Sequence, residues 1–216
     1  FINHGFRGSG DIGLGLDNLS GARPLLAQTL SDAGYETAYF GRWHIPLPTD
    51  RPDLHGYSTV CKHDLDDKAI APDLSAWLDR RKDGPFFAVT SICDPHDICH
   101  WPRYISDEKH GIPNGPIPDA PEPGDCPLLP DNFEIPENEP SIIREFQDFR
   151  APHYRAPYFD KDQWRQYRWA YWRFVEKADS IIAGILKELD ERNLRNDTVI
   201  VFASDHGDGG ASHRWC

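Results

Sequence analysis

The sequence predicts an α/β fold, a mostly parallel sheet with helices on both faces. One observation is the order of patterns along the chain, which runs helix, strand, helix, strand, long loop, helix, strand. Another is that the apolar runs do not alternate with polar residues, as is typical of strands buried on both faces. A third is that polar residues follow these runs, where α/β sheets collect their binding groups. No internal repeat is present, and we treat residues 1–216 as part of one domain.

The two ends of the sequence indicate a segment of a larger protein. The 216 residues contain no methionine, begin abruptly at Phe1 and stop at Cys216 inside a polar turn. We therefore expect a core that is truncated at both ends. No apolar run approaches the roughly 20 residues that a membrane helix needs, so we expect no membrane span in this chain.

The charge of the chain argues against nucleic acid as a partner. The formal net charge is −12, and the 23 Lys and Arg residues are dispersed among 35 acidic ones. Phosphate backbones require a basic stripe, which this distribution does not supply. An anionic substrate would have to be attracted locally, by a metal ion and a few cationic side chains in a cleft.

The first half of the chain contains two predicted helices and two predicted strands. Pro24 opens a helix that continues to about Ala33, and a strand follows from Tyr35 to Phe40. A modest amphipathic helix is predicted over 73–81, and a second strand over 86–92. The glycine-rich stretch before Pro24 includes a GxGxxG pattern at 8–13. Because no strand precedes it and no helix begins within it, we predict a surface loop there.

A proline-rich, acidic stretch extends from about Ile98 to Phe159. Such composition favours extended backbone and offers little apolar surface to bury. We therefore expect a long excursion without a second core. Two interpretations stay open, a loop that selects the substrate and a wrap that is only structural.

The last third is predicted to hold one long helix and one strand. Asp160 and Gln163 form a capping pair, and an apolar stripe that includes several aromatic residues then recurs at helical spacing up to Asn193. We expect that stripe to pack against the sheet. The run from Thr198 to Ala203 is predicted to be a strand buried on both faces, and it leads into Ser-Asp-His and a glycine-rich turn.

The predicted strands place candidate functional residues at one edge of the sheet. Right-handed crossovers between parallel strands bring their carboxyl ends to the same edge. The residues that would converge there are Arg42, His44, His96, Asp205 and His206. Each of them alone is more often structural, and Asp-His-Gly alone can be an ordinary turn. Their coincidence after three predicted strands is what favours a site.

These residue types suit metal binding and the handling of a tetrahedral anion. Asp205 offers a hard oxygen and His206 a nitrogen, so calcium is a candidate ion and zinc or manganese stays open. Two ligands do not hold a divalent ion, and we expect others from outside this chain or from the long loop. Arg42 carries a permanent fork of donors for an oxyanion, while His44 and His96 could donate or exchange protons.

Four ordered motifs resemble the sulfatase family of the alkaline-phosphatase superfamily. They lie at 30–44, 85–97, 179–208 and 213–215 and cover most of the chain except the proline-rich stretch. The segment Asp-Pro-His-Asp-Ile-Cys at 94–99 is most similar to bacterial sulfatases of the heparan N-sulfatase type. The resemblance implies an alkaline-phosphatase-like core, and it makes residues 1–216 part of a sulfatase catalytic domain with an excursion at about 98–159.

The resemblance also implies roles for the candidate residues. Asp205 and His206 would ligate one divalent metal ion, commonly Ca²⁺. His44 and Arg42 would contact the nucleophile and the sulfate, and His96 would act near the leaving-group oxygen. In this family a cysteine in a Cys-x-Pro-Ser-Arg context is oxidised to formylglycine, whose hydrate attacks sulfur.

The chain departs from the family pattern in several ways. Relatives usually carry Lys where this chain has Arg42, which keeps the charge but changes its reach. None of the five cysteines lies in the nucleophile motif, the N-terminal aspartate pair is absent, and the lysine expected shortly after Trp215 lies beyond the end. We therefore expect the formylglycine outside this chain and the isolated 216 residues to be inactive.

The leading hypothesis is the central part of a metal-dependent sulfatase that hydrolyses sulfate esters or N-sulfate of a carbohydrate or other sulfated small molecule. One alternative is a phosphatase or phosphonate monoester hydrolase of the same superfamily, which also holds a tetrahedral anion. Another is an inactive relative that only binds anionic sugars. Sulfatases that resemble this chain are usually exported, which favours a periplasmic or secreted protein.

Overall fold

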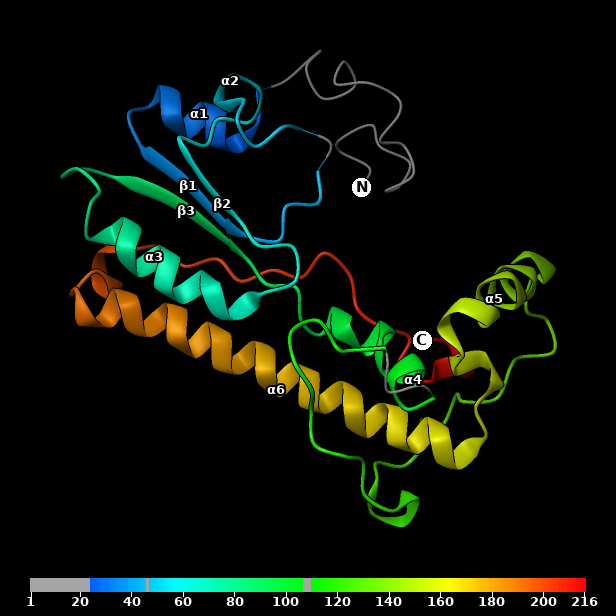
Figure 1. Cartoon of the computed structure of the whole chain (residues 1–216). Coiled ribbons are helices and arrows are strands. Elements are labelled where there is room, and N and C mark those ends of the chain that lie inside the picture. The colour runs from blue at the N-terminus through cyan, green and yellow to red at the C-terminus, as the bar shows by residue number, and fades with distance from the viewer. Residues whose placement is uncertain (1–23, 46, 107–109) are drawn as a thin grey trace. The chain divides into compact units, whose positions relative to one another are not determined.

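The computed structural model describes residues 24–45, 47–106 and 110–216. The chain divides into two compact units, Phe1–Cys93 and Asp94–Cys216, each of which has its own packing (Figure 1). The surface loop predicted around the GxGxxG pattern at 8–13 lies outside the described residues.

The first unit contains a parallel sheet. Its strands are β1 (Glu36–Gly41), β2 (Thr59–Lys62) and β3 (Phe86–Ser91), in the order β2-β1-β3, and both pairs are parallel. The two predicted strands in this half of the chain are therefore confirmed as β1 and β3. β2 was not predicted, because its four residues, Thr-Val-Cys-Lys, are too few to show a period.

Helices cover both faces of this sheet, as predicted. They are α1 (Leu26–Asp32), α2 (Pro52–His55) and α3 (Ile70–Leu78), with α1 and α3 on opposite sides of the strands in Figure 1. The central strand β1 is buried between them, and its Phe40 is fully inaccessible. Helix α3 begins at Ile70, earlier than the predicted 73, and so brings Ile70 into the core.

The second unit is organised around one long helix. Its helices are α4 (Trp101–Tyr104), α5 (Ser141–Tyr154) and α6 (Lys161–Glu191). The predicted capping pair is confirmed: a carboxylate oxygen of Asp160 accepts from the Gln163 backbone N–H at 2.8 Å, and the Gln163 amide oxygen accepts from the Asp160 N–H at 3.0 Å. This reciprocal pair satisfies two backbone donors at the helix start.

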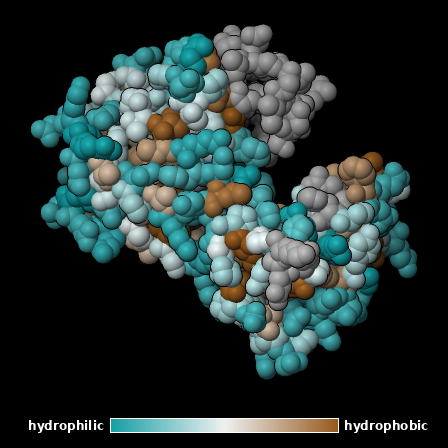
Figure 2. All heavy atoms as spheres, viewed as in Figure 1, coloured by the Kyte–Doolittle hydropathy of each residue, from teal (hydrophilic) through white to brown (hydrophobic). Residues whose placement is uncertain are grey.

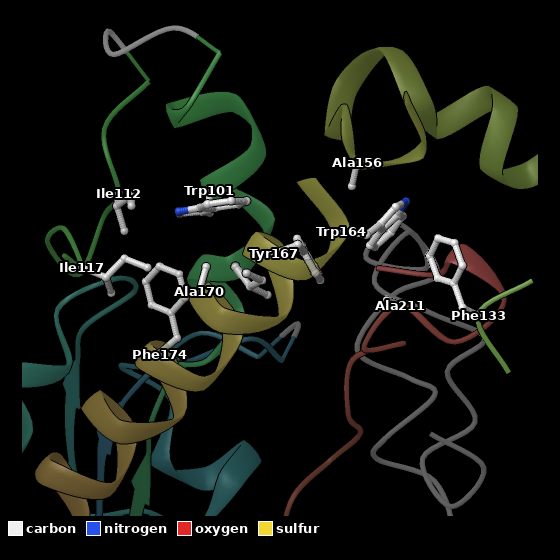
Figure 3. Close-up of a cluster of buried hydrophobic side chains, with 11 residues drawn as sticks. Trp101, Ile112, Ile117, Phe133, Ala156, Trp164, Tyr167, Ala170, Phe174 and Ala211 are labelled. Carbon is white, nitrogen blue, oxygen red and sulfur yellow. The ribbon is translucent and has the colours of Figure 1, made fainter. Parts of the chain in front are cut away.

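The expectation that the proline-rich stretch has no core of its own is wrong. Figure 3 shows a buried apolar cluster, and more than half of its members come from that stretch. The members are Ile98, Trp101, Ile112, Ile117, Phe133, Ala156, Trp164, Tyr167, Ala170, Phe174 and Ala211. The aromatic stripe of α6 packs against these scattered apolar residues. The average composition of the proline-rich stretch is polar, so it gave no sign of them.

The run from Thr198 to Ala203 is not a strand in the structure, which corrects the prediction of a strand buried on both faces. Thr198 has extended backbone angles, but no ladder is assigned to the described residues of this run. Val199, Val201 and Phe202 are 90%, 82% and 78% exposed. The apolar composition of the run allows its side chains to be buried. A β-strand also requires an adjacent strand that hydrogen-bonds to its backbone N–H and C=O groups.

Apolar surface is otherwise scattered. Hydrophilic residues cover most of the face drawn in Figure 2, in keeping with a mean hydropathy of −0.62. In the described part of the chain, no helix combines the length and apolar character required to cross a membrane.

Candidate active site

Arg42 and His44 leave the sheet directly after β1. The Arg42 backbone N–H donates to the Ser91 carbonyl oxygen at 2.9 Å, so the segment begins where β1 and β3 end together. The half-buried guanidinium donates to the buried Cys93 Sγ at 3.2 Å through Nη1. His44 is exposed. The structure thus places both predicted residues in one short segment at the strand end.

Gly41 makes this exit from the sheet possible. Its φ of +103° is a conformation that side chains with a Cβ rarely adopt, and a Cβ there would collide with the Ser91 carbonyl oxygen. Beyond it, the buried Trp43 anchors the segment, because its indole Nε1 donates to the Leu47 carbonyl oxygen at 2.7 Å. The glycine and the tryptophan therefore fix the path on which Arg42 and His44 lie.

In the second unit, His96 opens a short 3₁₀ turn, His96–Cys99. Its ring is exposed, with its centroid 6.4 Å from that of His100. The next residue, Asp97, is fully buried and accepts from the Asn114 backbone N–H at 2.7 Å through Oδ2. This bond ties the turn to the following loop, so an exposed imidazole sits on a fixed backbone.

Asp205 and His206 lie together and are both exposed. Oδ2 of Asp205 is 3.5 Å from Nε2 of His206, while Oδ1 accepts from the His206 backbone N–H at 2.9 Å. The imidazole Nδ1 lies 3.0 Å from the Gly207 carbonyl oxygen. A carboxylate oxygen and an imidazole nitrogen are thus adjacent and open to solvent, a donor pair that fits part of the coordination shell of a divalent cation.

A partly buried acid close to this pair, Asp208, was not among the predicted residues. One carboxylate oxygen of Asp208, Oδ2, accepts from the Tyr167 hydroxyl at 2.8 Å, and Oδ1 accepts from the Gly210 N–H at 2.7 Å. Burial raises the pKa of Asp208 and raises that of Tyr167 well above its usual range. The sequence did carry a hint, because a tyrosine inside a buried helical stripe needs a partner for its hydroxyl.

The structure therefore brings together Arg42 and His44 after β1 in the first unit, and Asp205 and His206 in the second. His96 lies on its own turn of the second unit. The convergence of all five residues on one site stays a prediction.

Comparison with known proteins identifies the class. A family profile described as Sulfatase matches residues 1–214. The chain is 29% identical over 208 residues to a Delta 4,5-hexuronate-2-O-sulfatase of Bacteroides thetaiotaomicron, covering 88% of this chain and 40% of that protein. It is 24% identical over 213 residues to an ulvan-active sulfatase of Formosa agariphila, covering 85% and 35%. The chain belongs to the sulfatase family.

Solved structures agree with this assignment. The structure of a 2-O GAG sulfatase superposes with a TM-score of 0.70 at 25% identity, over 91% of this chain and 43% of the other. The predicted alkaline-phosphatase-like α/β class is thereby confirmed. The chain spans 40% and 35% of the lengths of the two curated relatives named above. A multifunctional alkaline phosphatase superfamily protein of Trinickia caryophylli is also similar, at 26% identity over 179 residues.

Proposed function

We propose that this chain is the central part of a metal-dependent sulfatase that hydrolyses sulfate esters of an acidic carbohydrate through a formylglycine supplied from outside these residues. The observation that carries the proposal is the family match over residues 1–214, which includes every candidate residue. The names of two relatives, a hexuronate-2-O-sulfatase and an ulvan-active sulfatase, support a polysaccharide-derived substrate.

Arg42 is proposed to bind the sulfate. Its guanidinium presents paired N–H donors that match two oxygens of a tetrahedral anion. The position of Arg42 supports this role, because its backbone is fixed by Ser91 and its side chain is half-buried. His44, two residues on and exposed, would donate to the nucleophile or to a sulfate oxygen.

His96 is proposed to protonate the leaving oxygen of the sugar. The oxygen leaves as an alkoxide unless a proton arrives, and an imidazole titrates near neutral pH. Exposure of the ring and the fixed turn beneath it, through buried Asp97, support a proton-donating role.

Asp205 and His206 are proposed to hold a divalent ion, with Ca²⁺ as the leading candidate and the remaining ligands supplied from elsewhere. When bound, the ion would offset negative charge on the sulfate oxygens and on the nucleophile. Asp208 is proposed to position this turn, because Tyr167 and the Gly210 N–H hold its carboxylate.

The test uses the full-length protein and measures sulfate release from a 2-O-sulfated unsaturated uronate disaccharide by ion chromatography. We expect His96→Ala to lower kcat by about 10²–10⁴-fold, the usual contribution of a general acid. We expect Arg42→Ala to lower it by about 10²–10³-fold and Arg42→Lys, which installs the family residue, by much less. His110→Ala, another exposed histidine, is the matched control. Equal activity of the His96 and His110 variants would remove the proposed acid.

The second candidate is a phosphatase or phosphonate monoester hydrolase. The similarity to the multifunctional alkaline phosphatase superfamily protein favours keeping it, since one anion site can accept either ester. Phosphate release from a matched sugar phosphate, with no sulfate release, would establish it. Binding of the sulfated sugar without any turnover would instead establish an inactive sugar-binding relative.

A further inference from the structure

Lys177 of α6 is a charged residue of the second unit that the proposed chemistry does not use. Its ammonium Nζ lies 3.4 Å from Oδ2 of Asp94. It also donates to the backbone carbonyl oxygens of Asn114 and Gly115, at 3.1 Å and 2.8 Å. The ring centroid of Phe174, three residues earlier on the helix, is 5.2 Å away. One ammonium group therefore contacts two stretches of the chain that are far apart in sequence.

The carboxylate that this ammonium group contacts is buried. The side chain of Asp94 is 2% exposed, and that of Lys177 is 26% exposed. A carboxylate removed from water needs a cation or hydrogen-bond donors to offset the lost hydration. On the surface of the same helix, Lys187 pairs with Glu191, and those side chains are 69% and 54% exposed. The pair at Asp94 therefore fixes a buried group, whereas the surface pair does not.

Both stretches that Lys177 contacts adjoin the turn that carries His96. Asp94 comes two residues before His96. Asp97 comes directly after it, is fully buried and accepts from the Asn114 backbone N–H at 2.7 Å. The ammonium group thus supports this turn on both sides, directly through Asp94 and indirectly through Asn114.

The loop on the far side of this arrangement is itself anchored to α6. Ile112 and Ile117 flank the two carbonyl groups that Lys177 binds. Both isoleucines belong, with Phe174 of α6, to the buried cluster shown in Figure 3. Displacing the loop would expose these side chains to water, which is unfavourable in proportion to the apolar area exposed. The backbone acceptors of Lys177 are therefore held in place by packing.

We propose that Lys177 is a positioning residue for His96. Its ammonium group would fix the turn so that the imidazole meets the leaving oxygen of the substrate and passes its proton to that oxygen as the S–O bond breaks. This inference rests on the proposed function, in which His96 is the proton donor. Because a misplacement of about 1 Å can lower a rate by about 10²-fold, loss of the ammonium group should lower kcat. KM should stay nearly unchanged, since Lys177 is not proposed to touch the substrate.

The test compares Lys177→Met, which removes the charge and keeps a long side chain, with Lys187→Met, the same change at an exposed position of α6. Sulfate release by the full-length protein is measured on a 2-O-sulfated uronate disaccharide and on 4-nitrophenyl sulfate. Nitrophenolate is a good leaving group that departs without a proton, so its release does not need a general acid. We expect Lys177→Met to lower kcat on the disaccharide by about 10–10²-fold and to change it little on the nitrophenyl ester. Lys187→Met should change neither.

Two further variants separate positioning from a loss of fold. Lys177→Arg keeps a charged donor, and we expect it to retain most of the activity on the disaccharide. Asp94→Asn removes the same ion pair from the other side. Combining it with Lys177→Met should therefore lower kcat by much less than the product of the two single losses. Thermal unfolding of each variant shows whether the fold is retained.

Several outcomes would overturn the inference. These are equal kcat values for Lys177→Met and Lys187→Met, equal losses for Lys177→Met on the two substrates, or single losses that multiply in the double variant. His96→Ala, measured alongside, keeps the two proposals apart. If His96→Ala loses activity selectively on the disaccharide and Lys177→Met does not, only the role of Lys177 is removed. Equal losses for His96→Ala on both substrates, or no sulfate release by the unmutated protein, would remove the proposed function and this inference with it.

Discussion

Strand β3 and the run Thr198–Ala203 are two apolar segments of similar composition with different outcomes. β3, with the sequence Phe-Phe-Ala-Val-Thr-Ser, pairs residue by residue with β1, from Glu36↔Phe86 to Gly41↔Ser91. The other run, Thr-Val-Ile-Val-Phe-Ala, has no ladder among the described residues, and its residues from Val199 to Ala203 are exposed. Apolar β-branched composition therefore indicates what a segment can do, and an available partner strand decides whether it does so.

The same contrast bears on the site. Arg42 follows a paired strand, and its backbone N–H continues the pairing to Ser91. Asp205 and His206 follow the unpaired run and are held mainly by bonds between adjacent residues. The first pair is thus positioned by the sheet and the second by its own turn.

The largest expected difference between a paired strand and the unpaired run is in the free energy of unfolding, when one phenylalanine in each is replaced by alanine. Phe40→Ala, in the buried strand β1, should lower the free energy of unfolding by about 3–5 kcal/mol because it opens a core cavity. Phe202→Ala, at a 78% exposed position, should change it by no more than about 0.5 kcal/mol. Urea unfolding followed by circular dichroism measures both. Equal losses would show that the run is buried in solution.

A smaller effect is expected at the end of β1. Gly41→Ala combines a positive φ with a collision against the Ser91 carbonyl oxygen, so it should destabilise more than Gly34→Ala. Gly34 also has a positive φ but open space around it, and its substitution should cost about 1–2 kcal/mol. The comparison uses chemical denaturation of both variants. If Gly41→Ala is the milder change, the tight exit from the sheet is absent.

The smallest effect is a dependence on alkaline pH beside β3. Tyr57 stacks on Phe87 of β3, with centroids 6.1 Å apart, and burial raises its pKa to about 12. A raised folded-state pKa means that stability is complete below the unfolded value, about 10, and is lost as pH rises toward 12. Tyr57→Phe should therefore flatten the stability profile between these values. An unchanged profile in thermal unfolding scans would show that Tyr57 is solvated.

The elements that could be predicted are those whose local sequence pattern matches the way they pack in the structure. β1, β3 and α6 with its capping pair were predicted from composition, helical spacing and the Asp160 cap, all of which are local. β2 was missed because four residues carry no period. The core contribution of the proline-rich stretch was missed because its apolar residues are far apart in sequence and meet only through α6.

The candidate site was predictable to a similar extent. The positions of Arg42 and His44 after a strand follow from pattern alone, and the structure places them there. Asp208 was missed, because its burial depends on Tyr167, which lies 41 residues earlier. The predicted strand before Asp205 does not form, because no described residue pairs with this run.

The most direct test of the central claim is a side-by-side assay of the full-length protein on a 2-O-sulfated uronate disaccharide and on the matching phosphate ester, with Ca²⁺ present and after chelation. We predict sulfate release that far exceeds phosphate release and is lost on chelation and in Asp205→Asn. Release of phosphate but not sulfate, or sulfate release that is indifferent to both chelation and Asp205, would contradict the account.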